Sequence, residues 1–212
     1  MASNDVLITC GTLILEGIVQ TPDHGQGMSG GALICHPHPL YGGNMHNNVT
    51  RALSDALVQR GLVSLRFNFR GTGKSQGRHG EGLDEMQDVK AALDFLLQQQ
   101  GVDPARIVLA GYSFGCLVGL RAASEDPRPT HLIGISPPLD AYDFAFLRAE
   151  TRPKLLVAGD RDFICPVEQF KALVDEIPEP KKGVTIEGDD HFHIGREKYL
   201  VGAADEFLDE FP

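Results

Sequence analysis

The feature that most constrains this chain is the alternation of short apolar runs with longer amphipathic ones. The apolar runs have the length and composition of buried strands and cover residues 12–20, 31–35, 62–69, 106–113, 131–138, 154–160 and 183–189. Helices are expected at 47–61, 83–101, 114–125, near 166–177 and at 197–211. This order predicts an α/β fold, a mostly parallel twisted sheet with helices on both faces. Residues 31–35 are also a candidate to pair with 12–20 across a glycine-rich turn at 21–31.

The length and composition of the chain fit one domain. A sequence of 212 residues with 42% hydrophobic and 23% charged side chains can bury one large core, so we expect a single domain over residues 1–212. The net charge of -10 makes nucleic acid and anionic membranes poor partners. No apolar stretch approaches the roughly 20 residues that span a bilayer.

The N-terminus and the cysteines bear on the compartment. The segment MASNDVLITCGTLIL has no basic start followed by a long apolar run, so it gives no sign of secretion. Cys10, Cys35, Cys116 and Cys165 show no C-x-x-C spacing. We therefore expect reduced, buried thiols in a cytoplasmic protein.

The stretch GYSFG at 111–115 carries the clearest chemical signal. It fits G-x-S-x-G and stands between an apolar strand and a helix, the context in which this motif forms a nucleophile elbow. The flanking glycines allow a sharp turn, which would expose the Ser113 hydroxyl at the edge of the sheet. The alternative is a serine that only caps the following helix.

A serine nucleophile needs a base, and the base needs an orienting acid. Asp160 and Asp162 follow the strand at 154–160, and His191 and His193 follow the last strand. The order Ser…Asp…His is the one expected for this elbow in such a sheet. From position alone, either aspartate and either histidine could serve.

These motifs resemble the α/β-hydrolase fold serine hydrolases, from about residue 30 to the C-terminus. FNFRGTGKSQG (67–77) and HPHPLYGGNMHNN (36–48) are similar to segments of small, lidless, dienelactone-hydrolase-like bacterial proteins. Dienelactone hydrolases use a cysteine nucleophile, whereas this chain has Ser113. The resemblance implies Asp162 as the acid, because G-x-x-D with a following proline fits 159–166, and His191 as the base. Asp160 would then bind backbone in its turn, and His193 would cap the next helix.

The oxyanion of an acyl-transfer reaction needs two backbone N–H donors. One is expected at Phe114, directly after the nucleophile, and the other in the loop after residues 31–35. The resemblance places this second donor at His38, two residues after the first histidine of the loop. Leu40 and Tyr41 remain alternatives.

Two other patterns suggest a nucleotide-binding loop and a zinc site, but their residue spacing does not fit either. GTGKS (71–75) is not a P-loop, because Asn68 stands where the first glycine is required. As a family loop it is expected to be structural, with Arg70 binding backbone carbonyls. The histidines show no zinc-ligand spacing, and the prolines after His36 and His38 turn those two side chains to opposite sides of the chain. We therefore expect no metal and no cofactor.

The predicted function is that of a serine hydrolase, an esterase acting on small acyl esters through Ser113, His191 and Asp162 and an acyl-enzyme. Residues 139–153 are too few for a full lid, so the pocket should be open. Thioesters, amides and peptides suit the same triad, and a non-catalytic binding protein or a metal-dependent hydrolase are the other readings. The partner is expected to be a small molecule, and the sequence does not indicate an oligomeric state.

Overall fold

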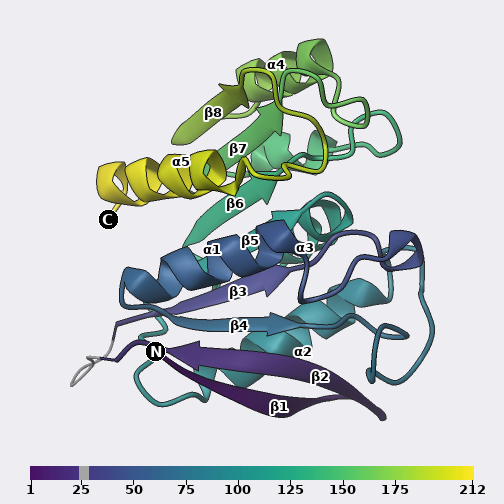
Figure 1. The fold of residues 1–212 in the computed structure, drawn as a ribbon, viewed down its shortest axis with the longest axis vertical. Coiled ribbons are helices and arrows are strands. Elements are labelled where there is room, and N and C mark those ends of the chain that lie inside the picture. Colours follow the sequence, from purple (N-terminus) through teal and green to yellow (C-terminus); the bar gives the residue numbers. More distant parts are fainter. Residues whose placement is uncertain (24–28) are drawn as a thin grey trace.

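A computed structural model describes residues 1–23 and 29–212, and part of the turn predicted at 21–31 therefore lies outside the described residues. Its strands form one eight-stranded sheet in the order β1-β2-β4-β3-β5-β6-β7-β8 (Figure 1). All strands from β3 onward are parallel to one another, while β1 and β2 form an antiparallel hairpin at one edge. The strands are β1 (Ala2–Cys10), β2 (Leu13–Thr21), β3 (Gly31–Cys35), β4 (Val63–Phe67), β5 (Ile107–Tyr112), β6 (His131–Ile135), β7 (Lys154–Gly159) and β8 (Lys181–Ile186).

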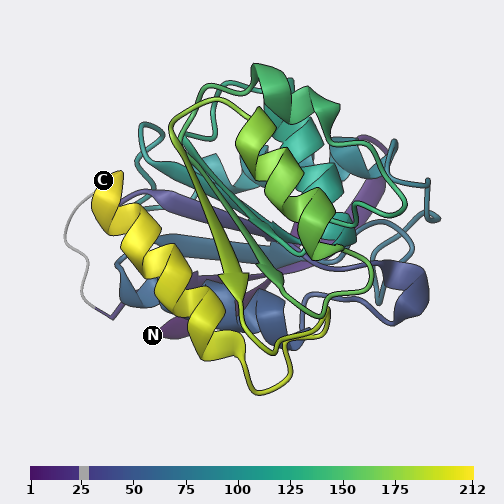
Figure 2. The same cartoon turned by 90° about the horizontal axis from the view of Figure 1, so that it is seen from above.

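Helices cover both faces of the sheet, as predicted (Figures 1 and 2). The buried residues form two clusters, one on each side. The first contains residues of α2, α3 and α4, and the second contains residues of α1 and α5. The helices are α1 (Asn48–Gln59), α2 (Glu85–Leu97), α3 (Phe114–Ser124), α4 (Val167–Glu176) and α5 (Glu197–Glu210). No helix in the described part of the chain has the length and apolar character needed to cross a membrane.

Strand β3 shows why a central run can be apolar at every position. Leu33 and Cys35 belong to the cluster of α2, α3 and α4, whereas Ala32 and Ile34 belong to the cluster of α1 and α5. Successive side chains of a strand point to opposite faces, and both faces of this sheet are covered. An uninterrupted apolar run is therefore the pattern of a central parallel strand here.

The N-terminal edge differs from the sequence-based expectation. Strand β1 (Ala2–Cys10) was not predicted, because its burial alternates: Ile8 is buried while Leu7 is 71% exposed. The expected pairing of 31–35 with 12–20 was wrong, since β3 pairs with β4 and β5. Strand β4 lies between β2 and β3, so the hairpin partner of β2 is the preceding strand β1.

The parallel order brings the functional loops together. The carboxyl ends of β5, β6, β7 and β8 lie on the same side of the sheet, so the loops that follow these four strands meet there. The segment after β6 contains only the short 3₁₀ helix η2 (Ala145–Ala149), and none of the residues that the structure describes forms a lid over this edge. The expectation of a minimal hydrolase fold with a short helix in place of a lid is confirmed.

Candidate active site

The turn from β5 into α3 places Ser113 at the carboxyl end of the central strand β5. The residue has φ 53° and ψ -117°, and its N–H donates to the carbonyl of Ile135 at 2.9 Å. A Cβ at Gly111 would lie 2.2 Å from the carbonyl oxygen of Gly115, and one at Gly115 would lie 2.3 Å from that of Cys35. Only glycine fits both positions. The Ser113 side chain makes no capping bond to α3, so the helix-cap alternative is wrong.

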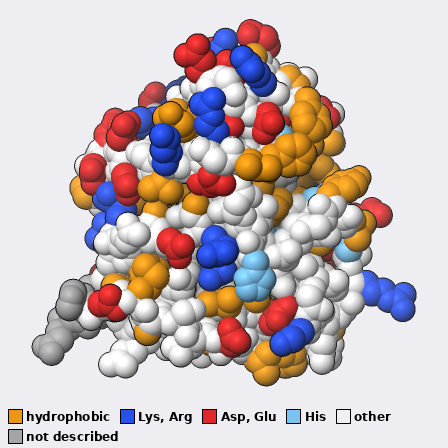
Figure 3. All heavy atoms as spheres, in the orientation of Figure 1, with side chains coloured by type: hydrophobic (Ala, Val, Ile, Leu, Met, Phe, Trp, Pro, Cys, Tyr) orange, Lys and Arg blue, Asp and Glu red, His pale blue; other side chains and the backbone are white. Residues whose placement is uncertain are grey.

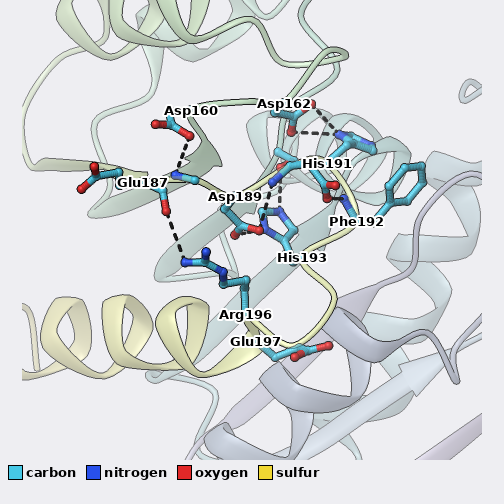
Figure 4. A network of polar contacts seen from close by, with 12 residues as sticks. Asp160, Asp162, Glu187, Asp189, His191, Phe192, His193, Arg196 and Glu197 are labelled. Atoms are coloured by element: carbon cyan, nitrogen blue, oxygen red, sulfur yellow. Dashed lines mark hydrogen bonds and ion pairs between the residues drawn. The ribbon is translucent and has the colours of Figure 1, made fainter.

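Ser113, His191 and Asp162 meet although they come from three strand ends. Nε2 of His191 lies 3.0 Å from Oγ of Ser113. Nδ1 of the same ring lies 2.9 Å from each carboxylate oxygen of Asp162 (Figure 4). Asp160 instead accepts the N–H of Gly188 at 2.7 Å, as expected for a residue that binds backbone in the turn.

The carboxylate of Asp162 is buried and held by several donors. The N–H groups of Ile164 and Cys165 each donate to Oδ1 at 2.9 Å. Burial alone would raise the pKa of Asp162, but the hydrogen bond and charge of His191, with smaller hydrogen bonds from Ser136 and Cys165, lower it overall. The acid therefore stays ionised beside the imidazole.

The loop that carries His191 is fixed from β5. The Tyr112 hydroxyl donates to the carbonyl oxygen of His191 at 2.6 Å. Burial raises the pKa of Tyr112, and the nearby Asp162 charge raises it further, so the phenol keeps its proton and remains a donor. The expectation that His193 caps the next helix was wrong. Its side chain is fully buried and bonds Asp189 and Ser136, while the residue preceding α5 is Arg196.

The two histidines of the loop after β3 have different surroundings. His36 is fully buried, and its Nε2 accepts the N–H of Phe69 at 3.0 Å while Nδ1 donates to the carbonyl of Pro37 at 2.6 Å. Burial lowers the pKa of His36 to about 4, which keeps the ring neutral and able to accept. The His38 ring lies instead against Phe114, with centroids 4.7 Å apart. His36 therefore anchors the loop, and His38 faces the elbow.

The backbone donors of this loop separate the three candidates. The N–H of Leu40 donates to the His38 ring at 3.3 Å, and that of Tyr41 donates to the carbonyl of His38 at 3.1 Å. The N–H groups of His38 and Phe114 make no hydrogen bond to any residue that the structure describes. Phe114 is the first residue of α3, and the first N–H of a helix has no partner within the helix, so the Phe114 N–H is free. Of the three candidates in this loop, His38 is thus the one whose N–H stays free, as that of Phe114 does.

Arg70 does not bind backbone carbonyls, and that prediction was wrong. Its guanidinium pairs with the fully buried carboxylate of Asp88, with Nη2 at 2.7 Å and Nε at 3.0 Å from Oδ1. The Arg70 N–H also donates to Asp88, at 2.9 Å. Loop 70–77 is therefore tied to α2 by an ion pair. Within residues 1–23 and 29–212, no group of three histidine, cysteine or acidic side chains could hold a metal ion.

The surface over Ser113 is open and bordered by apolar side chains. Tyr41, Phe163 and Phe192 are 87%, 63% and 50% exposed. The rings of Phe163 and Phe192 lie 6.2 and 6.0 Å from the His191 ring. Figure 3 shows hydrophobic side chains gathered on the right of this face, where Figure 1 places the loops that follow the strands. A groove of about 740 Å³ lies elsewhere, between β1, β2 and loop 39–46, and its lining includes neither Ser113 nor His191.

Fold and site together define a serine-type α/β hydrolase, and comparison with known proteins agrees. The family model described as serine aminopeptidase, S33, matches residues 32–151. This is more than half of the chain, and the protein belongs to that family. The matched segment contains Ser113 and the loop after β3 but ends before Asp162 and His191.

Similar proteins extend the likeness over the whole chain. An α/β serine hydrolase homologue from Coxiella burnetii is 38% identical, with a TM-score of 0.87 over 100% of this chain and 99% of that one. A serine hydrolase without a lid from Xanthomonas campestris is 28% identical, with a TM-score of 0.86 over 100% of this chain and 95% of that one. An uncharacterized protein of Rickettsia prowazekii is 36% identical over 84% of this chain and 77% of its own length.

Proposed function

We propose that this protein is a serine esterase that cleaves small acyl esters through an acyl-enzyme, with Ser113 as nucleophile, His191 as base and Asp162 as acid. The observation that carries the proposal is the continuous contact from Oγ of Ser113 through the His191 ring to the Asp162 carboxylate, with distances of 3.0 and 2.9 Å. Such a chain activates a hydroxyl that is otherwise a weak nucleophile.

In this mechanism Ser113 attacks the ester carbonyl while Nε2 of His191 takes the hydroxyl proton. Asp162 keeps the other proton on Nδ1 and stabilises the imidazolium. The oxyanion accepts hydrogen bonds from the N–H groups of His38 and Phe114. His191 then returns the proton to the leaving alcohol. A water molecule, activated by the same ring, hydrolyses the acyl-enzyme and restores Ser113.

The surroundings of Ser113 favour accessible esters with an apolar group. The exposed rings of Phe163 and Phe192 lie 6.1 Å apart and border the His191 side of the site. Tyr41 stands on the other side, with its ring 4.7 Å from that of His38. No segment in the described part of the chain closes over them, so an acyl or alkoxy group would rest on an open apolar surface. Small aryl or short alkyl esters fit this arrangement.

A fluorophosphonate labelling assay with acyl esters of graded length tests the proposal. The wild-type protein should be labelled at Ser113 and should hydrolyse activated short-chain esters. Ser113→Ala should abolish labelling and lower kcat by about 10⁴-fold or more, with little change in stability. Folded wild-type protein that neither takes up the label nor hydrolyses any activated ester would refute the function.

Amide or peptide cleavage is the second candidate, because the matching family is described as a serine aminopeptidase. The same nucleophile and base serve both reactions, and they differ in the leaving group that His191 must protonate. Parallel assays on an ester and an amide with one common acyl group separate the two. A kcat/KM for the amide equal to or above that for the ester would reverse the preference proposed here.

A further inference from the structure

The loop that precedes α2 returns to the elbow at His79, a residue that the proposed mechanism does not use. The centroid of the His79 ring lies 5.0 Å from that of His38 and 5.4 Å from that of Phe114, and the last two rings are 4.7 Å apart. Rings at these separations are in packing contact. His38 and Phe114 are the residues whose backbone N–H groups are proposed to bind the oxyanion. His79 therefore packs against both residues of the proposed oxyanion site.

Glu85, the first residue of α2, holds this loop from the interior, and its side chain is fully buried. Its Oε1 accepts the N–H of Gly80 at 2.7 Å, and its Oε2 accepts that of Gly82 at 2.8 Å. Nδ1 of His79 lies 3.0 Å from Oε1 but outside the geometry of a hydrogen bond, so this contact is a close approach without a fixed direction. Residues 79–82 thus wrap around one buried carboxylate, and each of its oxygens has a backbone donor.

The same loop meets Phe114 at a second point. A Cβ at Gly82 would be in van der Waals contact with the Phe114 ring, 3.5 Å from its Cε2, so the backbone of the loop passes beside that ring. Gly82 has a φ of 89°, a left-handed conformation that favours glycine. The hydrogen bond from its N–H to Glu85 fixes this turn. Glu85 therefore places two parts of the loop, the His79 ring and the Gly82 backbone, against Phe114.

The direction of the His38 N–H is fixed within its own loop. The carbonyl oxygen of Pro37 accepts Nδ1 of His36 at 2.6 Å. In a trans peptide group the C=O and N–H bonds point in opposite directions, so this bond also sets the direction of the His38 N–H. The His38 carbonyl accepts two further N–H groups of the loop, at 3.1 and 3.0 Å. All these bonds lie within residues 36–43, whereas Phe114 belongs to α3. The separation of the two donors therefore depends on contacts between the loop and the elbow, and the three packed rings are such contacts.

We propose that His79 and Glu85 are positioning residues that hold His38 against Phe114 and so set the separation of the two N–H groups that bind the oxyanion. This inference rests on the proposed function. Glu85 fixes the loop, and the His79 ring transmits that position to the two donor residues. Oxyanion donors act at about 2.7–3.1 Å from the oxygen of the transition state, so a small displacement weakens the transition state more than it weakens substrate binding. In this role neither residue touches the reacting atoms.

Three variants test this role by steady-state kinetics on an activated ester. His79→Ala removes the ring, and Glu85→Gln replaces one carboxylate oxygen with an amide nitrogen that cannot accept the backbone N–H facing it. In both, kcat should fall about tenfold or more while KM stays within about twofold, because the lost interaction belongs to the transition state. His79→Phe keeps a ring between His38 and Phe114, so its kcat should stay within about threefold of the wild type. A loss in His79→Phe equal to that in His79→Ala would overturn the proposal.

Inhibition by butylboronic acid separates positioning from a general loss of structure. Oγ of Ser113 adds to boron, and the tetrahedral adduct carries an oxygen at the place of the oxyanion. In His79→Ala and Glu85→Gln, the inhibition constant should therefore rise by the same factor as kcat/KM falls. A variant that only contains less active protein would lose kcat but keep the wild-type inhibition constant. A lower kcat with an unchanged inhibition constant would thus show a merely structural role and overturn the proposal.

The matched control for His79→Ala is His46→Ala. His46 is an exposed histidine at the end of loop 39–46, and its removal should leave kcat and the butylboronic acid inhibition constant at wild-type values. The His79 side chain is 14% exposed, so His79→Ala should fold even if Glu85→Gln does not. His79→Ala protein that folds, labels at Ser113 and keeps the wild-type kcat would overturn the proposal and leave the proposed function intact. Failure of the proposed function would be seen separately, as absence of fluorophosphonate labelling at Ser113 in the wild-type protein.

Discussion

The neutral His36 ring makes the stability of this protein depend on pH in a specific way. Its Nε2 must stay bare to accept the Phe69 N–H at 3.0 Å, and burial lowers its pKa from 6.5 to about 4. Between these two values the unfolded chain holds a proton that the folded chain does not. The free energy of unfolding therefore falls as the pH falls through this window.

The size of the effect follows from the same two values. At about 1.4 kcal/mol per pH unit, this pKa difference corresponds to about 3 kcal/mol. The contribution is complete above pH 6.5 and is lost by about pH 4. His38 and His131, whose pKa values burial also lowers, act in the same direction. A comparison with His36→Gln removes their share, because the glutamine does not titrate.

Urea unfolding at several pH values between 7 and 4 measures this contribution. The chain has no tryptophan, so circular dichroism is the suitable signal. From pH 7 to pH 4 the wild-type protein should lose about 3 kcal/mol more than His36→Gln. His46→Gln changes an exposed histidine of the same loop and should behave as the wild type. Parallel losses in the wild type and His36→Gln would show that His36 is not held neutral, and the reasoning would fail.

Three further substitutions address the loops and the site. Asp88→Asn leaves the Arg70 guanidinium without its buried carboxylate and should lower the free energy of unfolding by about 3 kcal/mol in urea titrations; a change below about 1 kcal/mol would contradict the ion pair as an anchor. Phe192→Ala should raise KM about tenfold for a longer acyl ester and leave that for an acetyl ester unchanged, which initial-rate assays resolve. Gly115→Ala puts a Cβ 2.3 Å from the Cys35 carbonyl oxygen and should lower kcat about 100-fold in a folded protein; near-normal kcat would show that the elbow tolerates displacement.

The parallel part of the fold could be predicted because most of its central strands are apolar at nearly every position. Strand β3 is apolar and buried throughout its five residues, and β4 is also buried throughout although it contains Ser64 and Arg66. The N-terminal hairpin could not be predicted in the same way. Strand β1 has one face in solvent and polar residues at its start, and its role depends on which strand lies beside β2. Neighbour relations across a crossover leave no local mark in the sequence.

The proposed triad lies in short segments that sequence reasoning could single out, because each member lies in the loop or turn that follows a strand. The contacts of His193 with Asp189 and Ser136 could not be found in this way. Ser136 follows β6 without any motif, and Asp189 and His193 read as the flanks of the His191 loop. Their relation depends on the order of β6, β7 and β8 in the sheet, together with positive φ angles at Ser136 and His193. Strand order and local strain, rather than residue spacing, create this network.

The histidine pairs at 36 and 38 and at 191 and 193 suggest a metal site when only the sequence is considered, yet in both pairs the fully buried ring, that of His36 or His193, has two protein partners. His36 binds Phe69 and Pro37 through its two nitrogens, and His193 binds Asp189 and Ser136. A metal ion would have to displace a hydrogen bond inside the core at either ring. In the proposed mechanism the other member of each pair serves Ser113, through the backbone N–H of His38 and the side chain of His191. In each pair, one histidine thus holds the loop in the interior and the other acts at the proposed site. Substitution of His36 or His193 should therefore disturb catalysis although neither side chain contacts the substrate.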